Sequence, residues 1–362
     1  MLPKVAIIIL NYNSWKDTIE CLESVLRNNY SNYQVILIDN NSSNNSMEYI
    51  KSWAEGKQKI LTPEPSHPLY SLSHPPIKKP IPYIYYTREE AENGGKIELE
   101  EKFQNANFQN STTKYPLIFI QTGENLGFAG GNNVGIKYVL AKNDSDYVLL
   151  LNNDTVVDPN FLNEMVKVAI KDKKIAIVGS IIADYYTEKI VFTNSKIDKK
   201  LKGKIKLDYL NSCKDYWETE RVSGASMMIK LEYILKYNLF LDENLFLYCE
   251  EIDICLRANK KHNLKIVTAG KSKIYHKEGA SCGKGTDPLP IYYITRNRIL
   301  LSKKLLNLKS RIIFWIYFIP SRLIRVLKWA VKGRWDLIKI TYFAFKDGIQ
   351  ENGGKNTIKM FI

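Results

Sequence analysis

Three carboxylates, Glu250, Glu251 and Asp253, lie within four positions of one another among apolar residues. Carboxylates this close raise one another's pKa, and a carboxyl group with a raised pKa can act as a general base at neutral pH. Acidic residues are also favourable in the first turn of any helix, because they interact with the positive end of its dipole. The pattern therefore has two interpretations, a catalytic base or an ordinary helix start.

Asp154 is a candidate ligand for a divalent cation. It follows the apolar run Leu149–Leu151, which is typical of a buried strand that ends at the edge of a sheet. Mg²⁺ takes one or two protein carboxylates and completes its coordination with phosphate oxygens and water. The alternative for Asp154 is a turn or helix-cap residue ahead of Asp158. Spacing alone leaves both interpretations open.

A glycine-rich stretch, Glu124–Gly135, opens a predicted helix. Glycine lets a backbone approach a ligand closely, and the N-terminus of a helix favours phosphate. The spacing differs from G-x-G-x-x-G, so it does not indicate a dinucleotide-binding fold. A purely structural turn is the alternative. The same alternative applies to His276, which follows the strand-like run Lys265–Ala269.

The apolar pattern predicts a scaffold for these residues. Five runs typical of buried strands alternate with helical patterns: Val5–Leu10, Gln34–Ile38, Leu117–Ile120, Tyr147–Leu151 and Ile175–Val178. This alternation predicts an α/β domain with a mostly parallel central sheet flanked by helices, in which ligands bind beyond the carboxyl ends of the strands. The polar tips at 11–13, 39–40 and 152–154 should therefore converge on one crevice.

The order of these segments resembles that of the family 2 glycosyltransferases, an inverting family with the GT-A fold, and especially their rhamnosyltransferase-like branch. The resemblance covers about residues 4–55 and 117–300. The motifs that carry it are Val5–Ser14, Ile38–Ser42, Asn125–Gly135, Leu151–Thr155, Val222–Ala225, Tyr248–Arg257, His276 with Gly279 and Ser281, and Arg296-Asn297. It implies a GT-A domain over residues 1–290.

The resemblance implies donor-binding roles for the matching positions. Asp39 would hydrogen-bond the nucleobase of a nucleotide-sugar, and Asn11 and Asn13 would line the same pocket. Further donor-binding positions would border the sugar and the diphosphate: Asn125, Gly127, Gly130, Asn132, Asn152, Asp154, Gly224 and Arg296.

The resemblance also implies a cofactor and a base. Asp154 would bind Mg²⁺ or Mn²⁺ in the D-x-D position, and His276 would be a second metal ligand or a diphosphate contact. The first acidic position of D-x-D is Asn152 in this chain. The base in the family is usually the aspartate of a Glu-Asp pair. Glu251 takes that place here, with Glu250 as the second candidate.

The implied reaction moves a sugar from a dTDP- or UDP-linked donor, with dTDP-rhamnose as one candidate, to a hydroxyl group of a glycan or lipid-linked glycan in cell-surface polysaccharide synthesis. A nucleotidyltransferase is disfavoured, because Asn11–Ser14 stands where it would need a glycine-rich loop with a lysine. A non-catalytic glycan-binding or membrane scaffold relative is the other alternative. Asp39, Asp154 and Glu251 argue against such a degenerate relative.

Residues 56–116 interrupt the α/β pattern. Seven of the 13 prolines lie between Pro63 and Pro82, a density that disfavours regular helices and central strands. We expect a partly disordered insertion in a surface loop of the catalytic domain, with a short helix near Ile97–Phe103.

Residues 291–362 predict a basic, amphipathic helical extension. The chain carries 52 Lys and Arg against 38 Asp and Glu, and from position 296 onward 15 basic residues face three acidic ones. Four basic residues follow helical spacing: Arg322, Arg325, Lys328 and Lys332. Such a segment suits the surface of an anionic membrane. The alternative is a helix packed on the catalytic domain with a solvated basic face. Nucleic acid is disfavoured, since no nucleic-acid motif accompanies the charge.

The remaining features indicate a cytoplasmic protein at the inner face of the cell membrane. The N-terminus lacks the charged segment and cleavage site of a signal peptide. The longest strongly apolar run, Ile312–Ile319, is too short to span a bilayer. Five cysteines without a C-x-x-C pair predict reduced thiols rather than a disulfide or zinc framework.

Overall fold

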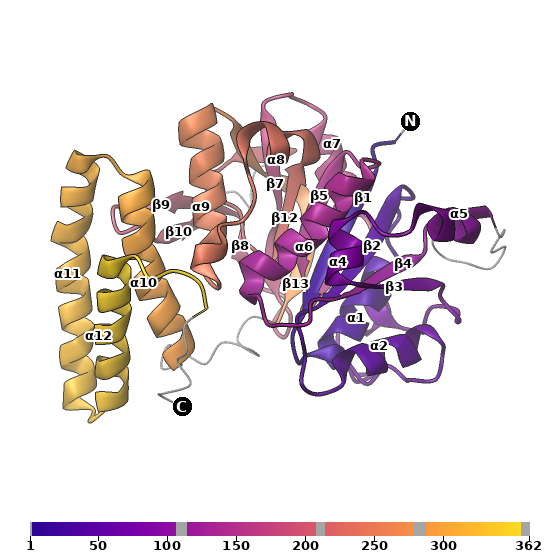
Figure 1. The fold of residues 1–362 in the computed structure, drawn as a ribbon, viewed down its shortest axis with the longest axis horizontal. Helices are drawn as coiled ribbons and strands as arrows, with labels where there is room; N and C mark the ends of the chain where they lie inside the picture. The colour runs from indigo at the N-terminus through magenta and orange to yellow at the C-terminus, as the bar shows by residue number, and fades with distance from the viewer. Residues whose placement is uncertain (1, 106–113, 208–213, 278–286, 356–362) are drawn as a thin grey trace.

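The computed structural model describes residues 2–105, 114–207, 214–277 and 287–355. Figure 1 shows an α/β body built on one central sheet, with three long helices side by side at one end. Two motif residues, Gly279 and Ser281, and two of the cysteines, Cys213 and Cys282, lie outside the described residues. The other three cysteines are buried free thiols, as predicted.

The strands are β1 (Val5–Asn11), β2 (Tyr33–Asp39), β3 (Tyr83–Thr87), β4 (Leu117–Gln121), β5 (Tyr147–Asn152), β6 (Thr155–Val157), β7 (Ile175–Asp184), β8 (Ile190–Phe192), β9 (Asn194–Ile197), β10 (Gly203–Lys206), β11 (Tyr216–Glu218), β12 (Ser226–Lys230) and β13 (Lys265–His276). The helices are α1 (Trp15–Val25), α2 (Ser46–Ala54), α3 (Tyr70–Ser73), α4 (Arg88–Glu92), α5 (Ile97–Asn105), α6 (Gly127–Lys142), α7 (Phe161–Ala169), α8 (Leu231–Tyr237), η1 (Glu243–Leu245), α9 (Glu250–Leu256), η2 (Arg257–Lys261), α10 (Pro288–Leu305), α11 (Leu308–Val331) and α12 (Trp335–Gln350).

The central sheet has the order β11-β13-β7-β12-β5-β1-β2-β4-β3, with β6 and β8 paired to β13 and β7. Its five neighbours β5, β1, β2, β4 and β3 are all parallel. β12 runs antiparallel between β5 and β7, and β11 runs antiparallel at the edge. Helices cover both faces of this sheet (Figure 1), which confirms the predicted α/β class.

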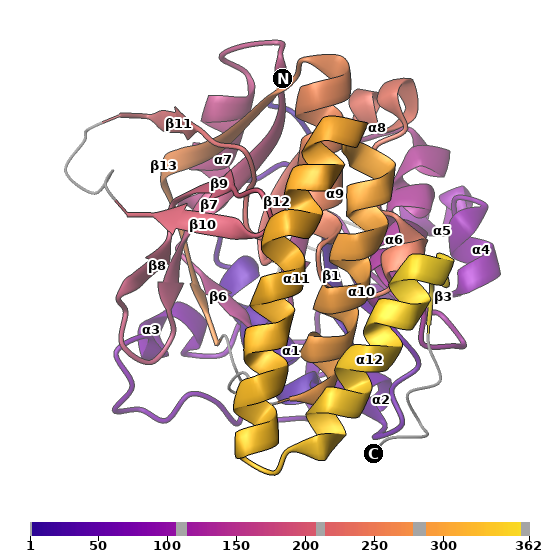
Figure 2. The ribbon, with the colours of Figure 1, turned by 90° about the vertical axis from the view of Figure 1, so that its left-hand side faces the viewer.

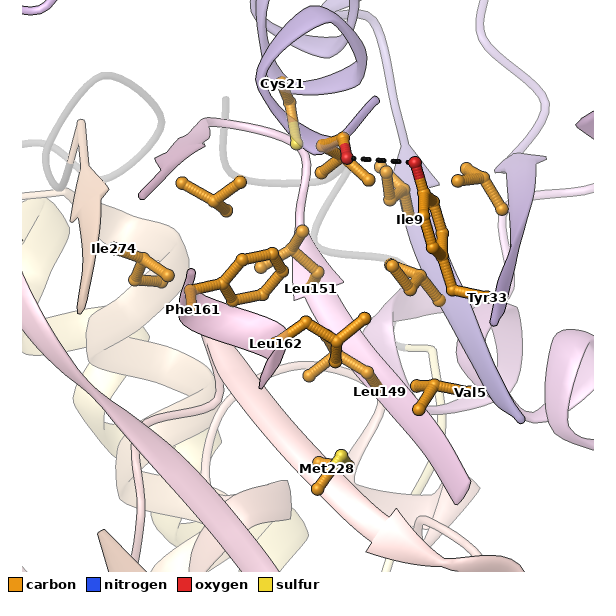
Figure 3. Close-up of a cluster of buried hydrophobic side chains, with 14 of the residues drawn as sticks. Val5, Ile9, Cys21, Tyr33, Leu149, Leu151, Phe161, Leu162, Met228 and Ile274 are labelled. Atoms are coloured by element: carbon orange, nitrogen blue, oxygen red, sulfur yellow. Dashed lines mark hydrogen bonds between the residues drawn. The ribbon is translucent and has the colours of Figure 1, made fainter. Parts of the chain in front are cut away.

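The central strands are apolar because both of their faces are covered. Val5 and Ile9 of β1 belong to the core cluster that includes α1, α2 and α7, whereas Ile8 belongs to the cluster that includes α6 and α9. Figure 3 shows part of the first cluster, where the hydroxyl group of Tyr33 also donates a 3.3 Å hydrogen bond to the Val25 carbonyl. This packing holds the carboxyl ends of β1, β2 and β5 in fixed register.

The proline-dense segment, residues 56–116, contributes β3, which pairs parallel with β4 at the sheet edge. The helix expected near residues 97–103 is present as α5. Two buried carboxylates of α1 anchor the segment. Glu20 accepts a 3.0 Å hydrogen bond from Thr62, and Glu23 accepts bonds from the backbone of Ile77 at 2.8 Å and from Lys79 at 2.6 Å. This part of the segment is therefore tied to the domain by contacts that its composition did not reveal.

The three C-terminal helices pack on one another at one end of the molecule. α10 and α12 lie very close, since a Cβ at Gly348 would come within 2.9 Å of the Cβ of Ile299. Figure 2 shows α11 and α12 in front of the α/β body, so that the outer side of α11 faces away from it. Among the residues that the structure describes, no helix has the length and apolar character to span a membrane.

The structure corrects one element of the predicted basic face. Arg325, Lys328 and Lys332 are exposed, but Arg322 is only 8% exposed and lies against Phe318. Three residues advance a helix by about 300°, so Arg322 lies about 60° around the helix from Arg325. That rotation carries its side chain from the outer face of α11 to the side that packs on α10.

Candidate active site

Three parallel strands bring the predicted polar tips to one edge of the sheet. Asn11 is the register partner of Asp39 across β1 and β2, and Leu10 is the partner of Asn152 across β1 and β5. Residues paired in adjacent parallel strands lie side by side, so the three tips reach the same edge. The predicted convergence of the tips is confirmed.

A buried amide and a buried carboxylate form the first part of the site. Asn11 Nδ2 donates to Asp39 Oδ1 at 2.6 Å, and the backbone N–H of Ser42 donates to Asp39 Oδ2 at 3.0 Å. Asn13 is exposed, and its Oδ1 accepts a 2.8 Å bond from the backbone N–H of Ser43. These contacts join the loops that follow β1 and β2 and hold the Asp39 carboxylate in one orientation.

The glycine-rich stretch is fastened to the same edge. Asn40 Nδ2 donates to Asn125 Oδ1 and to the Gly127 carbonyl, each at 3.1 Å. Gly127 has a φ of +70°, and a Cβ here would lie 2.3 Å from the carbonyl oxygen of Phe246. The backbone N–H of Phe128 donates to that carbonyl at 2.7 Å. Glycine is therefore required where this turn meets the loop that precedes α9.

Close packing explains why small or buried residues follow this turn. A Cβ at Gly131 would come within 2.5 Å of Leu10 Cδ1, and one at Gly130 within 2.8 Å of the Leu126 Cβ. Asn132 is buried, and its Nδ2 donates to a carbonyl of its own helix at 2.8 Å. These glycines let α6 lie close to the sheet, a role that sequence alone could not separate from close approach to a ligand.

Asp154 and His276 form the second part of the site. β13 pairs antiparallel with β6 so that His276 lies opposite Thr155. As a result, Asp154 Oδ1 lies 3.1 Å from His276 Nε2, and the side-chain nitrogen Nδ2 of Asn152 lies 3.4 Å from His276 Nε2. Burial alone would raise the pKa of Asp154, but its hydrogen bond to His276 and the charge of His276 lower it overall. Asp154 is therefore an ionised carboxylate at neutral pH.

This pair suits a divalent cation that is shared with a ligand. Asp154 is a carboxylate and His276 an imidazole, the two kinds of side chain that would hold Mn²⁺ together, and they lie 3.1 Å apart. No group of three or more His, Cys, Asp or Glu able to hold a metal occurs among the described residues. The protein would thus supply two ligands, and phosphate oxygens and water would supply the others.

The Val222–Ala225 motif lies beside Asn152. The backbone N–H of Asn152 donates to the Ala225 carbonyl at 3.1 Å. A Cβ at Gly224 would meet no atom within 4 Å, so Gly224 borders open space next to the second part of the site.

Arg296 and Asn297 hold the loop that leads into α9. Asn297 Nδ2 donates to the carbonyls of residues 245, 247 and 248 at 2.7 to 2.9 Å. Arg296 is fully buried, and its guanidinium donates to the carbonyls of residues 244, 245 and 354. These bonds engage the guanidinium inside the protein, so Arg296 supports the loop that leads into α9 from its place on α10. The donor contact expected for Arg296 stays a prediction.

Glu251 is the accessible carboxylate of α9. Its Oε1 forms an ion pair with Nη1 of Arg221, whose Nε donates to Ser195 Oγ at 3.1 Å. Within the described chain, Oε2 of Glu251 accepts no hydrogen bond. Asp253, by contrast, is fully buried and lies 2.7 Å from Arg257. Arg221 is a residue of the site that was not predicted from the sequence, where its one signal is its place directly before the Val222–Ala225 motif.

Glu250 is buried, and its Oε1 has no hydrogen-bond partner in the described part of the protein. Burial, with a contribution from the negative charge of Glu251, raises the pKa of Glu250 to about 8. Glu250 is therefore mostly protonated at neutral pH. Only a small fraction of Glu250 is ionised at pH 7, and its side chain is buried, whereas Glu251 is partly exposed. These surroundings favour Glu251 over Glu250 as a base.

The raised pKa of Glu250 predicts a pH-dependent stability. From its ordinary value of 4.5 up to about 8, the unfolded chain releases this proton while the folded chain keeps it. The free energy of unfolding therefore falls as the pH rises through this window. We expect Glu250→Gln to stabilise the protein by about 2 kcal/mol or more at pH 8 and by little at pH 5, measured by urea unfolding.

Glu98→Gln, at an exposed position of α5, is the matched control and should show no such difference between the two pH values. An equal effect of Glu250→Gln at pH 5 and pH 8 would show that Glu250 titrates normally.

Comparison with known proteins decides the family. Residues 6–64 and 101–237 match the model of glycosyl transferase family 2, more than half of the chain. The chain belongs to glycosyl transferase family 2. The match to this family is interrupted within the proline-dense segment that adds β3 and α5.

This family 2 member is also similar to two characterised proteins and to one solved structure. The low-salt glycan biosynthesis hexosyltransferase Agl10 of Haloferax volcanii is 25% identical over 246 residues, 66% of this chain and 77% of Agl10. Rhamnosyltransferase WbbL of Escherichia coli is 28% identical over 148 residues, 36% of this chain and about half (53%) of WbbL. The crystal structure of GalNAc-T7 with UDP, GalNAc and Mn²⁺ has a TM-score of 0.52 at 14% identity, covering 81% of this chain and 47% of that one. This last likeness confirms the predicted GT-A fold.

Proposed function

We propose that this family 2 glycosyltransferase transfers a sugar from a dTDP- or UDP-linked donor to a hydroxyl group of a glycan or lipid-linked glycan, with inversion at the anomeric carbon. The observation that carries the proposal is the meeting of the Asn11–Asp39 pair and the Asp154–His276 pair at one sheet edge. Agl10 is named a hexosyltransferase and WbbL a rhamnosyltransferase, and GalNAc-T7 was solved with UDP and Mn²⁺. These names support the reaction class and leave dTDP-rhamnose as one candidate donor.

In this proposal Asp39 hydrogen-bonds the nucleobase, with Asn11 and Asn13 beside it. Asp154 and His276 would hold Mg²⁺ or Mn²⁺, which when bound offsets the negative charge of the nucleoside diphosphate as it leaves. The wall of the donor pocket would be shaped largely by backbone and by small or amide side chains: Asn125, Gly127, Gly130, Asn132, Asn152 and Gly224.

Glu251 would act as the base. As the acceptor oxygen attacks the anomeric carbon, Oε2 of Glu251, the oxygen that is not paired with Arg221, takes the hydroxyl proton. The bond between the anomeric carbon and the diphosphate oxygen breaks, and its electron pair leaves with the nucleoside diphosphate. Arg221 holds the base in one orientation before the proton arrives. A single displacement of this kind inverts the configuration.

Thermal shift against a panel of nucleoside diphosphates and nucleotide-sugars, with and without Mn²⁺, tests the function. A ligand that binds only the folded state raises the melting temperature. We expect a metal-dependent rise with UDP or dTDP species, and the sugar that adds most to it identifies the donor. A folded protein that responds to no nucleotide would instead be a non-catalytic glycan-binding or scaffold relative.

We further propose that residues 1–290 form the catalytic domain and that residues 291–362 attach it to the inner face of the cell membrane. Seven exposed apolar residues follow one another along α11 at spacings of three or four: Leu308, Ile312, Ile316, Ile319, Leu323, Leu327 and Val331. Arg325, Lys328 and Lys332 are exposed on the same helix. An exposed apolar stripe flanked by cations suits an anionic lipid surface, where the stripe is buried and the cations meet the headgroups.

Cosedimentation with vesicles rich in phosphatidylglycerol tests this attachment. Leu327→Glu puts a negative charge into the stripe and removes an apolar contact, so we expect its vesicle affinity to fall about tenfold. Leu235→Glu on α8 is the matched control, because both leucines are 65% exposed. Equal binding of the two variants would exclude α11 as the lipid contact.

A further inference from the structure

The tip of the β9–β10 ribbon lies beside α10 and α11 (Figure 2), and four cations on these elements lie close enough to act on one another. They are Lys202 at the ribbon tip, Arg298 on α10, and Arg322 and Arg325 on α11. The elements that carry them share one apolar cluster, in which Leu201 of the ribbon joins Ile299 and Phe318. The cations are therefore brought together by the packing of the C-terminal helices onto the catalytic domain.

None of these four cations forms an ion pair with any residue that the structure describes. Arg298 is 9% exposed, and its Nε is buried without a hydrogen-bond partner there. The Arg322 guanidinium donates two long hydrogen bonds of 3.5 Å, to the hydroxyl oxygens of Thr295 and Ser321. Lys202 and Arg325 are exposed. The group thus has a buried floor of two arginines and an open rim.

The cations act on one another. Burial, with the positive charges of Arg325 and Arg298, lowers the pKa of Arg322 to about 9. Burial also lowers the pKa of Lys202, and Arg298 and Arg325 lower it further. Buried like charges without counterions oppose folding, so the arrangement would be favoured by a bound anion.

The carboxylates near this group balance its charge only in part. The negative charge of Asp198 acts to raise the pKa of both Arg298 and Lys202, but it is one charge beside four cations, and its Oδ1 accepts from the backbone N–H groups of residues 200 and 202 at 2.8 and 3.0 Å. Glu251 also influences Arg298, and its own ion pair is with Arg221. Because Glu251 acts on Arg298, the group of cations lies on the side of the domain that carries α9 and the proposed base.

We propose that Lys202, Arg298, Arg322 and Arg325 bind a phosphate or diphosphate group of the acceptor substrate. Arginine presents several N–H donors that match phosphate oxygens, and a diphosphate carries enough charge to meet more than two cations. The assignment rests on the proposed function, because it places the acceptor on the Glu251 side of the crevice. It narrows the acceptor class to glycans that carry phosphate or are linked to a lipid through phosphate.

Calorimetric titration of the full-length protein with inorganic pyrophosphate in EDTA tests the site without a metal. We expect Arg325→Gln to weaken binding about tenfold or more, whereas Lys328→Gln on the same helix, and Asp154→Asn in the donor site, leave it unchanged. Arg322→Gln should raise the melting temperature in phosphate-free buffer and abolish the rise that pyrophosphate causes in wild type. Geranyl diphosphate distinguishes the sources: tighter binding than pyrophosphate indicates a lipid-linked acceptor, and equal binding indicates a phosphate within the glycan.

Pyrophosphate binding that survives Arg325→Gln and Arg322→Gln would overturn the proposal, as would its absence in wild type. Nucleotide binding with Mn²⁺, measured in the same variants, distinguishes failure of the proposed phosphate site from failure of the proposed function. Arg325→Gln should keep the nucleotide response. A protein that binds pyrophosphate through Arg325 but no nucleotide would retain the phosphate site and lose the glycosyltransferase assignment.

Discussion

Glu251→Gln is expected to slow sugar transfer by about 10²- to 10⁴-fold while nucleotide binding stays near the wild-type level. Glutamine has nearly the same shape as glutamate, and its amide oxygen can still accept a bond from Arg221. It cannot take a proton from the acceptor hydroxyl group. The loss should therefore appear in kcat for transfer to the acceptor and not in the thermal shift that the nucleotide produces.

Glu250→Gln is the matched control for this experiment, because it makes the same substitution at the neighbouring position. Since Glu250 is buried and its pKa is raised to about 8, it is already neutral at pH 7, and we expect its variant to keep activity within a few-fold. If Glu250→Gln abolished transfer and Glu251→Gln did not, the assignment of the base would have to be exchanged.

Asp154→Asn is expected to remove the Mn²⁺-dependent part of the thermal shift with UDP or dTDP and to reduce transfer by about 10²- to 10³-fold. Asparagine can still hydrogen-bond His276, which lies 3.1 Å from Oδ1 in the wild type, so the local fold should survive. The substitution removes the one carboxylate that the pair offers to a cation. Stabilisation of the departing diphosphate should therefore be lost.

Asp158→Asn, four positions further along the chain, is the control. Asp158 caps a turn by accepting a 2.8 Å bond from the backbone N–H of Asn160, and we expect its variant to keep the metal response. A full Mn²⁺ response in Asp154→Asn would place the metal elsewhere and leave the Asp154–His276 pair as a structural hydrogen bond.

Much of the fold could be predicted because buried parallel strands have a simple signature. Covered on both faces, β1, β2, β4, β5 and β7 read as continuous apolar runs, and polar residues mark where each one ends. The convergence of Asn11, Asp39 and Asn152 followed from parallel topology alone. The edge strand β3 escaped prediction because it is half-exposed and lies in proline-dense sequence.

Two basic residues, Arg322 and Arg296, show what helical spacing and short motifs cannot predict. Helical spacing placed Arg322 with Arg325, yet a rotation of about 60° between them buries one and exposes the other. Arg296 matched a family motif, but its guanidinium is engaged by three backbone carbonyls. In both residues the surroundings of the side chain, and not its type, settle what it can contact.

The amino-acid sequence was enough to assign the α/β class and the family and to propose candidate site residues, because these depend on local periodicity and short motifs. The surroundings of the two adjacent glutamates depend on distant segments instead. Glu251 meets Arg221 from the loop before β12, whereas Glu250 lies buried without a partner for Oε1. Burial and ion pairing arise only when remote elements pack together, so only the folded chain distinguishes the ion-paired Glu251 from the buried, mostly protonated Glu250.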